Sequence, residues 1–203
     1  LCRTRGGTLL VGTRGRPPGE IHRSVDHGAS WIRVARLDAV DPLDHNVTCL
    51  AAAPRGRDIW ALTGGGRLWR SRDDGQSWEA AAPLPDIPRF GPYQRAYGLI
   101  CLPSRTLLAS DTHPDGGRVF RSVDGARTWH RVGRVSSAPL YRFQQVGGAV
   151  LVNGWAGKVH RSDDDGRTWN DPDPVGDSPL YATESVGPAV VLQASENGTL
   201  LRS

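Results

Sequence analysis

Methionine is absent from this chain of 203 residues, and several other features are missing as well. No apolar run is long enough to cross a membrane and no signal-peptide pattern is present, so we expect no membrane span. Because the chain begins at Leu1 rather than at a methionine, we expect a fragment or a processed form. The missing leader therefore says little about export.

Cysteine is scarce, and the three that occur, Cys2, Cys49 and Cys101, are an odd number that speaks against a disulfide framework. Their spacing to histidines matches no zinc pattern, so we expect no metal and no cofactor. Each cysteine precedes a repeated Arg-Ser pair by a similar interval, which places the three at equivalent positions on inner strands. Free cysteine commonly behaves as a small buried apolar residue. Such thiols fit a reducing compartment as well as an exported protein.

Lysine is almost absent, because Lys158 is the single lysine among 25 basic residues, and the net charge is +4. One interpretation is the arginine-rich codon usage of a GC-rich genome, and the other is a basic surface for nucleic acid. The basic residues are spread along the chain and interleaved with Asp. We therefore favour the first interpretation and expect no nucleic-acid partner.

Four segments of equal length share the pattern Gly-x-apolar-x-Arg-Ser-x-Asp-x-Gly-x-Ser/Thr-Trp, at residues 19–31, 66–78, 117–129 and 157–169, and a fifth copy at residues 198–203 stops after its Arg-Ser pair at the end of the chain. The first half alternates with the period of a β-strand. In the second half, Asp accepts hydrogen bonds from nearby backbone N–H groups and Gly supplies a positive φ. Each segment is therefore predicted to be a hairpin whose Trp anchors the turn.

The third segment departs from this pattern. Gly125 comes one place early, and Ala126 fills the usual glycine position. Since an alanine resists a positive φ, we expect a distorted or looser turn there.

The turn residues resemble the Asp-box, or bacterial neuraminidase repeat. The resemblance is carried by Ser24, Asp26, Gly28 and Trp31; by Ser71, Asp73, Gly75 and Trp78; by Ser122, Asp124 and Trp129; and by Ser162, Asp164, Gly166 and Trp169. With the flanking strands it covers essentially the whole chain. It implies a β-propeller in which each box joins the third and fourth strands of a blade.

The Asp-box resemblance does not imply one activity, because one fold hosts unrelated functions. Sialidases, xyloglucan-cleaving glycosidases, sortilin-type receptors and photosystem II assembly factors all contain such boxes. The family slightly favours an extracytoplasmic location, periplasmic or secreted, although the free cysteines leave a cytoplasmic location open. The composition is typical of a bacterial protein.

The predicted fold class is all-β, a single β-propeller domain of four-stranded antiparallel blades. Serines of successive repeats lie 40 to 51 residues apart, which suits such blades. We expect four full blades, the fourth ending in a short strand after Trp169, and an incomplete fifth blade that lacks its fourth strand. The predicted blades occupy residues 1–37, 47–82, 97–135, 140–175 and 180–203. Further blades are expected outside this segment, as part of a larger ring.

The recurrent arginines Arg23, Arg70, Arg121, Arg161 and Arg202 occupy one position of the repeat, which favours a structural role such as pairing with the neighbouring blade. His22 and His160 share a position with Trp69, Phe120 and Leu201, so they are interpreted as packing residues.

Any ligand site is expected on the face opposite the boxes, where the connections between second and third strands lie with those between blades. The candidate residues there are Trp155, Tyr93, Phe90, Arg89, Arg95, Asp44, His45 and His113. An exposed aromatic residue such as Trp155 can stack on a sugar ring or anchor a protein partner. The alternative is that Trp155 packs against a neighbouring blade.

No catalytic motif is evident. Glycosidases need two carboxyl groups at the bond, or a Tyr nucleophile assisted by Glu in sialidases. Tyr181 and Glu184 would lie on opposite faces of one strand. Acids could come from Asp41, Asp44, Asp111, Asp115 and Asp177, although such residues in polar loops are usually solvated. Asp163, Asp164 and Asp165 do not fit a calcium loop.

The sequence therefore predicts a non-catalytic binding or scaffold module that presents a loop face to a protein or glycan partner. The alternative is a glycoside hydrolase of sialidase-like or xyloglucanase-like type. A purely structural module within a larger chain is the third possibility.

Overall fold

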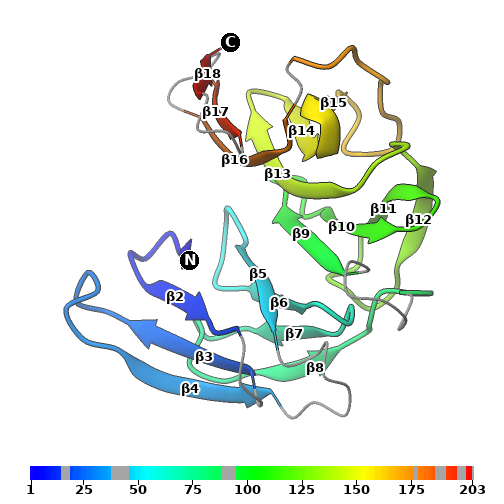
Figure 1. Cartoon of the computed structure of the whole chain (residues 1–203). Coiled ribbons are helices and arrows are strands. Elements are labelled where there is room, and N and C mark those ends of the chain that lie inside the picture. Colours follow the sequence, from blue (N-terminus) through cyan, green and yellow to red (C-terminus); the bar gives the residue numbers. More distant parts are fainter. Residues whose placement is uncertain are drawn as a thin grey trace.

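The chain folds into five antiparallel β-sheets arranged radially around one axis, as Figure 1 shows. This computed structural model describes residues 1–14, 19–37, 46–87, 95–175, 178–185, 191–195 and 200–202. Within each sheet the strands follow chain order from the axis outward, and the sheets follow one another around an open arc. The all-β propeller class predicted from the repeats is thereby confirmed.

Sheets 1 to 3 each contain four strands. Sheet 1 consists of β1 (Cys2–Arg3), β2 (Leu9–Gly12), β3 (Gly19–Ser24) and β4 (Ile32–Leu37). Sheet 2 consists of β5 (Val47–Ala52), β6 (Ile59–Thr63), β7 (Leu68–Ser71) and β8 (Glu79–Ala81). Sheet 3 consists of β9 (Ala96–Cys101), β10 (Leu107–His113), β11 (Gly116–Ser122) and β12 (His130–Arg134).

Sheets 4 and 5 each contain three strands among the described residues. Sheet 4 consists of β13 (Leu140–Val146), β14 (Ala149–Gly154) and β15 (Val159–Ser162), with the short 3₁₀ helix η2 (Trp155–Gly157) before β15. Sheet 5 consists of β16 (Leu180–Ser185), β17 (Val191–Ser195) and β18 (Leu200–Arg202). Sheet 5 has three strands, as predicted.

The short strand predicted after Trp169 does not form within the described residues 170–175, and this prediction was wrong. The segment after Trp169 still lies along β15, because Asn170 N donates to Arg161 O at 3.0 Å and Val175 N donates to Gly157 O at 2.9 Å. Pro172 and Pro174 lie between these two contacts and have no N–H to donate to a strand ladder. The edge of sheet 4 is therefore an irregular segment.

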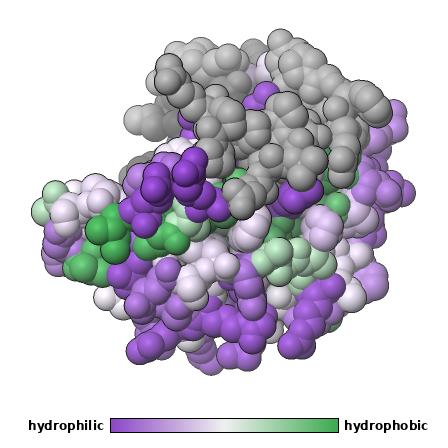
Figure 2. Space-filling model, turned by 90° about the horizontal axis from the view of Figure 1, so that it is seen from below, coloured by the Kyte–Doolittle hydropathy of each residue, from purple (hydrophilic) through white to green (hydrophobic). Residues whose placement is uncertain are grey.

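The core consists of apolar layers between neighbouring sheets. Leu10, Ile21 and Leu37 of sheet 1 pack with Val47, Ile59 and Ala61 of the next sheet. A second layer joins sheets 2 and 3, and a third joins sheets 3 and 4. Since β6, the second strand of sheet 2, is covered on both faces, it is buried at every position and its sequence Ile-Trp-Ala-Leu-Thr does not alternate between apolar and polar residues. Viewed across the outer strands of sheets 1 and 2, the surface is mostly hydrophilic, with hydrophobic side chains in smaller groups (Figure 2).

The four turns that follow the third strands of sheets 1 to 4 share one set of hydrogen bonds. In the second turn, Ser71 Oγ donates to Asp73 Oδ1 at 2.8 Å, and Gly75 N donates to Ser71 Oγ at 2.8 Å. Ser77 N also donates to Asp73 Oδ1, at 2.9 Å. Asp26, Asp124 and Asp164 accept the corresponding bonds in the other turns. Hence each carboxylate holds its turn closed, as expected for a stapled hairpin.

The third turn is not loose, which corrects the prediction made from its shifted glycine. Two consecutive residues have positive φ in every turn: Asp74 (62°) and Gly75 (83°) in the second, Gly125 (75°) and Ala126 (67°) in the third. The shift therefore only exchanges which of the two left-handed positions has the glycine. What does change is the indole partner, because Trp129 Nε1 donates to Ala82 O of the neighbouring sheet at 3.1 Å.

The recurrent arginines link neighbouring sheets, as predicted, in two cases. Arg23 Nε donates to Asp74 O at 2.9 Å, and Arg121 Nε donates to Asp165 O at 3.0 Å, in each case in the turn of the next sheet. Arg70 instead bonds to Asp58 of its own sheet at 3.1 Å, and Arg161 bonds to the adjacent Asp163 at 2.6 Å. The shared position thus serves two kinds of contact.

The two histidines at the shared packing position differ. His160 is fully buried, and its Nδ1 lies 2.9 Å from Asn170 O, in agreement with a packing role. His22 is only partly buried and lies 3.1 Å from Glu20 Oε2, so it also makes a polar contact within its own sheet.

Candidate ligand-binding face

Two ends of the sheets can be distinguished. We call the end with the four Ser–Asp turns the turn face, and the end with the connections between second and third strands and between sheets the loop face. Of the candidate residues, His113, Arg95 and Trp155 lie on the loop face within the described structure. Asp44, His45, Arg89, Phe90 and Tyr93 lie outside the described residues, as do Asp41 and Asp177.

His113 ends β10 at the tight connection to β11. Asp115 N donates to His113 Nδ1 at 3.2 Å, and the exposed Asp115 carboxylate lies 3.3 Å from the same nitrogen. His113 and Asp115 line a depression of about 200 Å³ together with Gly116, Arg118, Arg131 and Arg134. This part of the loop face is therefore rich in basic side chains.

Below the depression lies a buried ion pair. Arg118 Nε donates to Asp111 Oδ1 at 3.2 Å and to Asp111 Oδ2 at 3.0 Å, and Asp111 is 0% exposed. Arg118 also donates to Asp86 O at 3.0 Å, which ties sheet 3 to the segment after sheet 2. Asp111, a candidate solvated acid, is thus instead the counter-ion of a buried guanidinium, as buried charges require.

Arg95 precedes β9 and pairs with β10 through its backbone. Arg95 N donates to Thr112 Oγ1 at 2.9 Å, and Thr112 N donates to Arg95 O at 2.9 Å. Its side-chain Nε is buried and has no hydrogen-bond partner among the described residues. The backbone contacts hold Arg95 at the entrance to the inner strand of sheet 3.

Trp155 begins the 3₁₀ helix η2 and is 46% exposed. Its backbone N donates to Pro139 O at 2.9 Å, so the aromatic side chain stands on an anchored backbone. The half-exposed indole therefore presents part of its surface to solvent on the loop face. It offers apolar surface for stacking or for a hot-spot contact.

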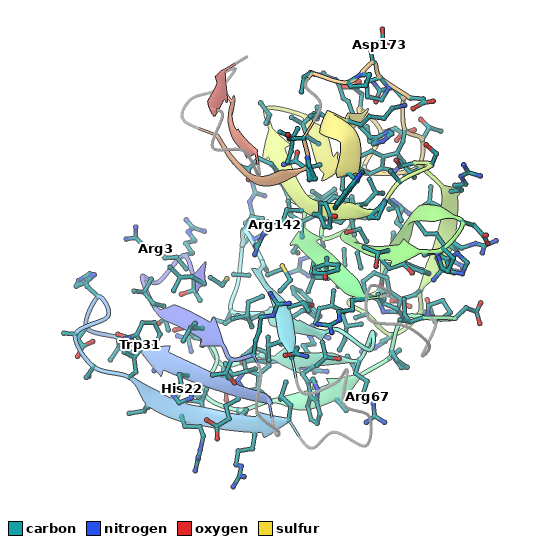
Figure 3. The ribbon with its side chains drawn as sticks, viewed as in Figure 1. Arg3, His22, Trp31, Arg67, Arg142 and Asp173 are labelled. Carbon is teal, nitrogen blue, oxygen red and sulfur yellow. The ribbon has the colours of Figure 1, made fainter. Side chains whose placement is uncertain are left out.

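Sheet 2 has a larger depression at the corresponding place, with fewer charged residues in its lining. It measures about 410 Å³ and is lined mostly by apolar residues such as Trp69, Leu84 and Ile87, together with Arg67 and Asp86. Arg67 is labelled in Figure 3. Neighbouring sheets therefore present different chemistry at equivalent positions of the loop face.

A third depression, of about 310 Å³, lies between the inner strands. Cys2, Cys49 and Cys101 line it, which confirms that the three cysteines occupy equivalent inner-strand positions, and all three are free. Burial raises the pKa of the Cys2 thiol to about 11 and that of Cys101 to about 12, so both are protonated near neutral pH. Arg3 and Arg142 line the same depression and lie on the concave side of the arc (Figure 3).

Among the residues that the structure describes, no group of three or more His, Cys, Asp or Glu side chains could hold a metal ion. None of the helices in the described ranges has the length and apolar character needed to cross a bilayer. Tyr181 and Glu184 both belong to β16.

Sequence reasoning did not single out Arg118, Arg131 and Arg134 for the loop face. A signal was available, because aligning the repeats places Arg33 with Arg131, and Arg36 with Arg134. The two sheets differ in the charge of the residue on the neighbouring strand. This residue is Glu20 in sheet 1, opposite Arg36, and Arg118 in sheet 3, opposite Arg134.

Comparison with solved structures agrees with the propeller architecture. YCF48 bound to D1 peptide matches with a TM-score of 0.63 and 21% identity over 92% of this chain and 58% of that one. A catalytically inactive virginiamycin B lyase from Staphylococcus aureus with quinupristin matches with a TM-score of 0.73 and 10% identity, over 99% of this chain and 64% of that one. The GH74 xyloglucanase from Xanthomonas campestris matches with a TM-score of 0.61 and 20% identity, over 98% of this chain and 28% of that one.

These neighbours are β-propeller proteins with different functions, so the likeness concerns the fold. This chain spans less than two thirds of the length of each of the three. No protein-family model matches the chain. No curated protein matches it either. The chain therefore has a β-propeller fold, and its function has to be argued from its own residues.

Proposed function

We propose that this chain is a non-catalytic binding module, a single β-propeller domain of the Asp-box type, whose loop face engages a protein partner. The Asp-box assignment is supported by the four turns in which one carboxylate accepts hydrogen bonds from a Ser or Thr side chain and from backbone N–H groups. Repetition of this arrangement favours a structural role for the turn face.

The single observation that supports binding most strongly is the combination on the loop face of a 46% exposed Trp155 with depressions of differing chemistry. Trp and Arg are the residues that most often dominate protein interfaces. The neighbour YCF48 was solved with a peptide bound, which is compatible with this use of the fold. A glycan partner remains the alternative ligand, since an indole also stacks on sugar rings.

Catalysis is the second candidate function, because a GH74 xyloglucanase shares the fold. A glycosidase requires a pair of carboxyl groups, one of them free to donate or accept a proton. Asp111 is buried and bound to Arg118, and Asp115 is 84% exposed beside His113. Neither environment favours a general acid, which supports binding over hydrolysis.

The test is capture of partners by the immobilised chain, with Trp155→Ala as the loop-face variant. Val123→Ala is the control, because Val123 is also exposed but lies in the third turn on the opposite face. We expect Trp155→Ala to lose partners that Val123→Ala retains. Equal capture by both variants would contradict the loop-face assignment. Release of an aryl leaving group from β-glycosides by the unmodified chain would favour the hydrolase instead.

A further inference from the structure

One pair of positions on the outer half of the sheets varies in charge. The first position follows the glycine that opens each repeat, and the second is the second residue after the repeated Trp. In sheet 1 these residues are Glu20 and Arg33, whose side chains form an ion pair at 2.9 Å. In sheet 4 they are Lys158 and Asp171, which form an ion pair at 2.7 Å with the charges reversed. Both sheets therefore neutralise this pair internally.

Sheet 3 has two cations at the same pair of positions, Arg118 and Arg131. The strand register confirms the equivalence, since Glu20 lies opposite Arg36 in sheet 1 and Arg118 lies opposite Arg134 in sheet 3. Sheet 3 thus has the same two outer arginines as sheet 1, with an arginine in place of the glutamate.

A β-bulge brings the two outer arginines of sheet 3 to one side. Residues three apart on a regular strand point to opposite faces. The register of β11 with β12 shifts between Val119 and Phe120, where Gly133 has a φ of 135°, so that Arg131 and Arg134 pair with Phe120 and Arg118. Such a bulge re-aims a side chain. In sheet 1 the equivalent shift lets Glu20 lie 2.9 Å from Arg33 and 3.9 Å from Arg36.

The acids near the sheet 3 depression are already used. Asp111 is bound to the buried Arg118, and Asp115 lies against His113. Arg134 Nε donates to a neutral acceptor, Ser136 O, at 3.4 Å. Within the ranges that the structure describes, Arg131 makes no ion pair, although its counterpart Arg33 has one. Two exposed guanidinium groups therefore line the depression together with one acid, Asp115, which lies against His113.

We propose that this depression binds a carboxylate side chain of an acidic segment in a partner protein, held by Arg131 and Arg134. The proposal rests on the loop-face function and names the chemistry of its partner. Sheet 1 supplies the internal precedent, because Glu20 places a carboxylate against the same two arginine positions. Guanidinium groups bind carboxylates through paired, charge-assisted hydrogen bonds.

A protein carboxylate is favoured over other anions by the precedent itself. The group that occupies the equivalent place in sheet 1 is a glutamate side chain entering from a β-strand. A glutamate on an extended partner segment has the same reach and charge.

The direct test uses the full chain and a fluorescein-labelled peptide of six glutamates, followed by fluorescence anisotropy at low salt. A peptide of six glutamines is the ligand control. We expect Arg131→Gln/Arg134→Gln to weaken binding about tenfold, which corresponds to about 1.4 kcal/mol. The matched control is Arg127→Gln/Arg167→Gln, which removes the same charge from the turn face and should change binding less than about twofold. Equal weakening by both double variants would overturn the site.

A second variant, which we call the graft, transfers two residues of sheet 1 to sheet 3. It tests the comparison with Glu20 without removing Arg131 or Arg134. Thr13 and Glu20 of sheet 1 correspond in register to Asp111 and Arg118. In Asp111→Thr/Arg118→Glu, the introduced carboxylate should pair with Arg131 and Arg134 and abolish peptide binding, with the melting transition retained. A folded graft that binds the peptide as well as the natural chain does would overturn the proposal.

Two further outcomes separate this proposal from the proposed function. If Trp155→Ala loses its partners but Arg131→Gln/Arg134→Gln keeps them, the loop face binds a partner and the carboxylate site is wrong. Binding of oligogalacturonate in preference to the glutamate peptide, lost in the same arginine variant, would overturn the protein identity of the ligand. Loss of partners and of glutamate peptide in the arginine variant is the result expected.

Discussion

The turn face and the loop face belong to the same sheets but repeat to different degrees. On the turn face, the four aspartates accept the same hydrogen bonds within 0.1 Å, with Ser Oγ to Asp Oδ1 distances of 2.7 to 2.8 Å. On the loop face, equivalent positions change from an ion pair to an apolar depression to a cluster of arginines. The repeated hydrogen bonds of the turn face stabilise every sheet, whereas the side chains that vary on the loop face are not required by every sheet and can contact a ligand.

The buried ion pair of Asp111 and Arg118 should be an exception to this comparison, because here a residue near the loop face stabilises the fold. Asp111→Asn leaves the Arg118 guanidinium buried without a counter-ion and should lower the free energy of unfolding by about 3–5 kcal/mol. The control Asp115→Asn, on the same hairpin but 84% exposed at the carboxylate, should stay within about 0.5 kcal/mol. Urea denaturation measures both. Equal midpoints for the two variants would contradict the role of Asp111.

The glycine of the fourth turn should give the next largest effect. Gly166 has a φ of 77°, and a Cβ added there would lie 2.5 Å from Leu108 Cδ2 of sheet 3. Gly166→Ala combines left-handed strain with overpacking and should cost about 2–4 kcal/mol of unfolding free energy. Ala126→Gly, at the equivalent position of the third turn, should change it by less than about 1 kcal/mol, because strain relief opposes the loss of a buried methyl group. Thermal melts of both variants test this difference between turns.

The stapling carboxylates should make the turn face sensitive to acid. Burial opposes ionisation of Asp73, yet hydrogen bonds from Ser77, Ser71 and Gln76 outweigh it and lower the pKa of Asp73 to about 2. The same balance lowers the pKa of Asp164 to about 2. A folded pKa below the unfolded value stabilises the fold above about pH 4, and this contribution is lost as the pH falls toward 2.

We therefore expect the melting temperature to fall between pH 4 and pH 2, and Asp73→Asn/Asp164→Asn to melt lower at pH 7 with a shallower acid dependence. The control variant Asp115→Asn, on the loop face, should keep the natural slope. Parallel melting curves for the double variant and the natural chain would show that these carboxylates do not couple to folding.

The strands and turns could be predicted from the sequence because their determinants are local. Alternation ends and the Asp-x-Gly turn begins at the repeated serine, and the third strands of sheets 1 to 3 end there, at Ser24, Ser71 and Ser122. The short strand after Trp169 was predicted wrongly, since Pro172 and Pro174 withhold the donors a ladder needs. The third turn was misjudged because its conformation has two left-handed positions, and a glycine at either one suffices.

The candidate site could be predicted less completely, because its determinants are not local. Alternation alone puts Arg131 and Arg134 on opposite faces, and only the bulge at Gly133 brings them together. Asp111 looked like a solvated acid, since its burial depends on Arg118 seven residues later. Trp155, Arg95 and His113 were expected on the loop face and lie there, while their role as a ligand site stays a prediction.

The smallest effect on stability should come from Trp155, and it sharpens the comparison of the two faces when set against Trp31. The two indoles are similarly exposed, at 46% and 39%. Trp31 Nε1 donates to Gly28 O at 3.1 Å within its turn, whereas Trp155 projects from a short 3₁₀ helix whose backbone is held by Pro139 O. Trp155→Ala should therefore lower the unfolding free energy by less than about 0.5 kcal/mol, and Trp31→Ala by about 1 kcal/mol or more, because the turn loses its hydrogen bond and its apolar anchor.

Partner capture should show the reverse order, with Trp31→Ala retaining what Trp155→Ala loses. If the variant that loses more stability also loses more partner capture, the division of structural and binding roles between the two faces is wrong.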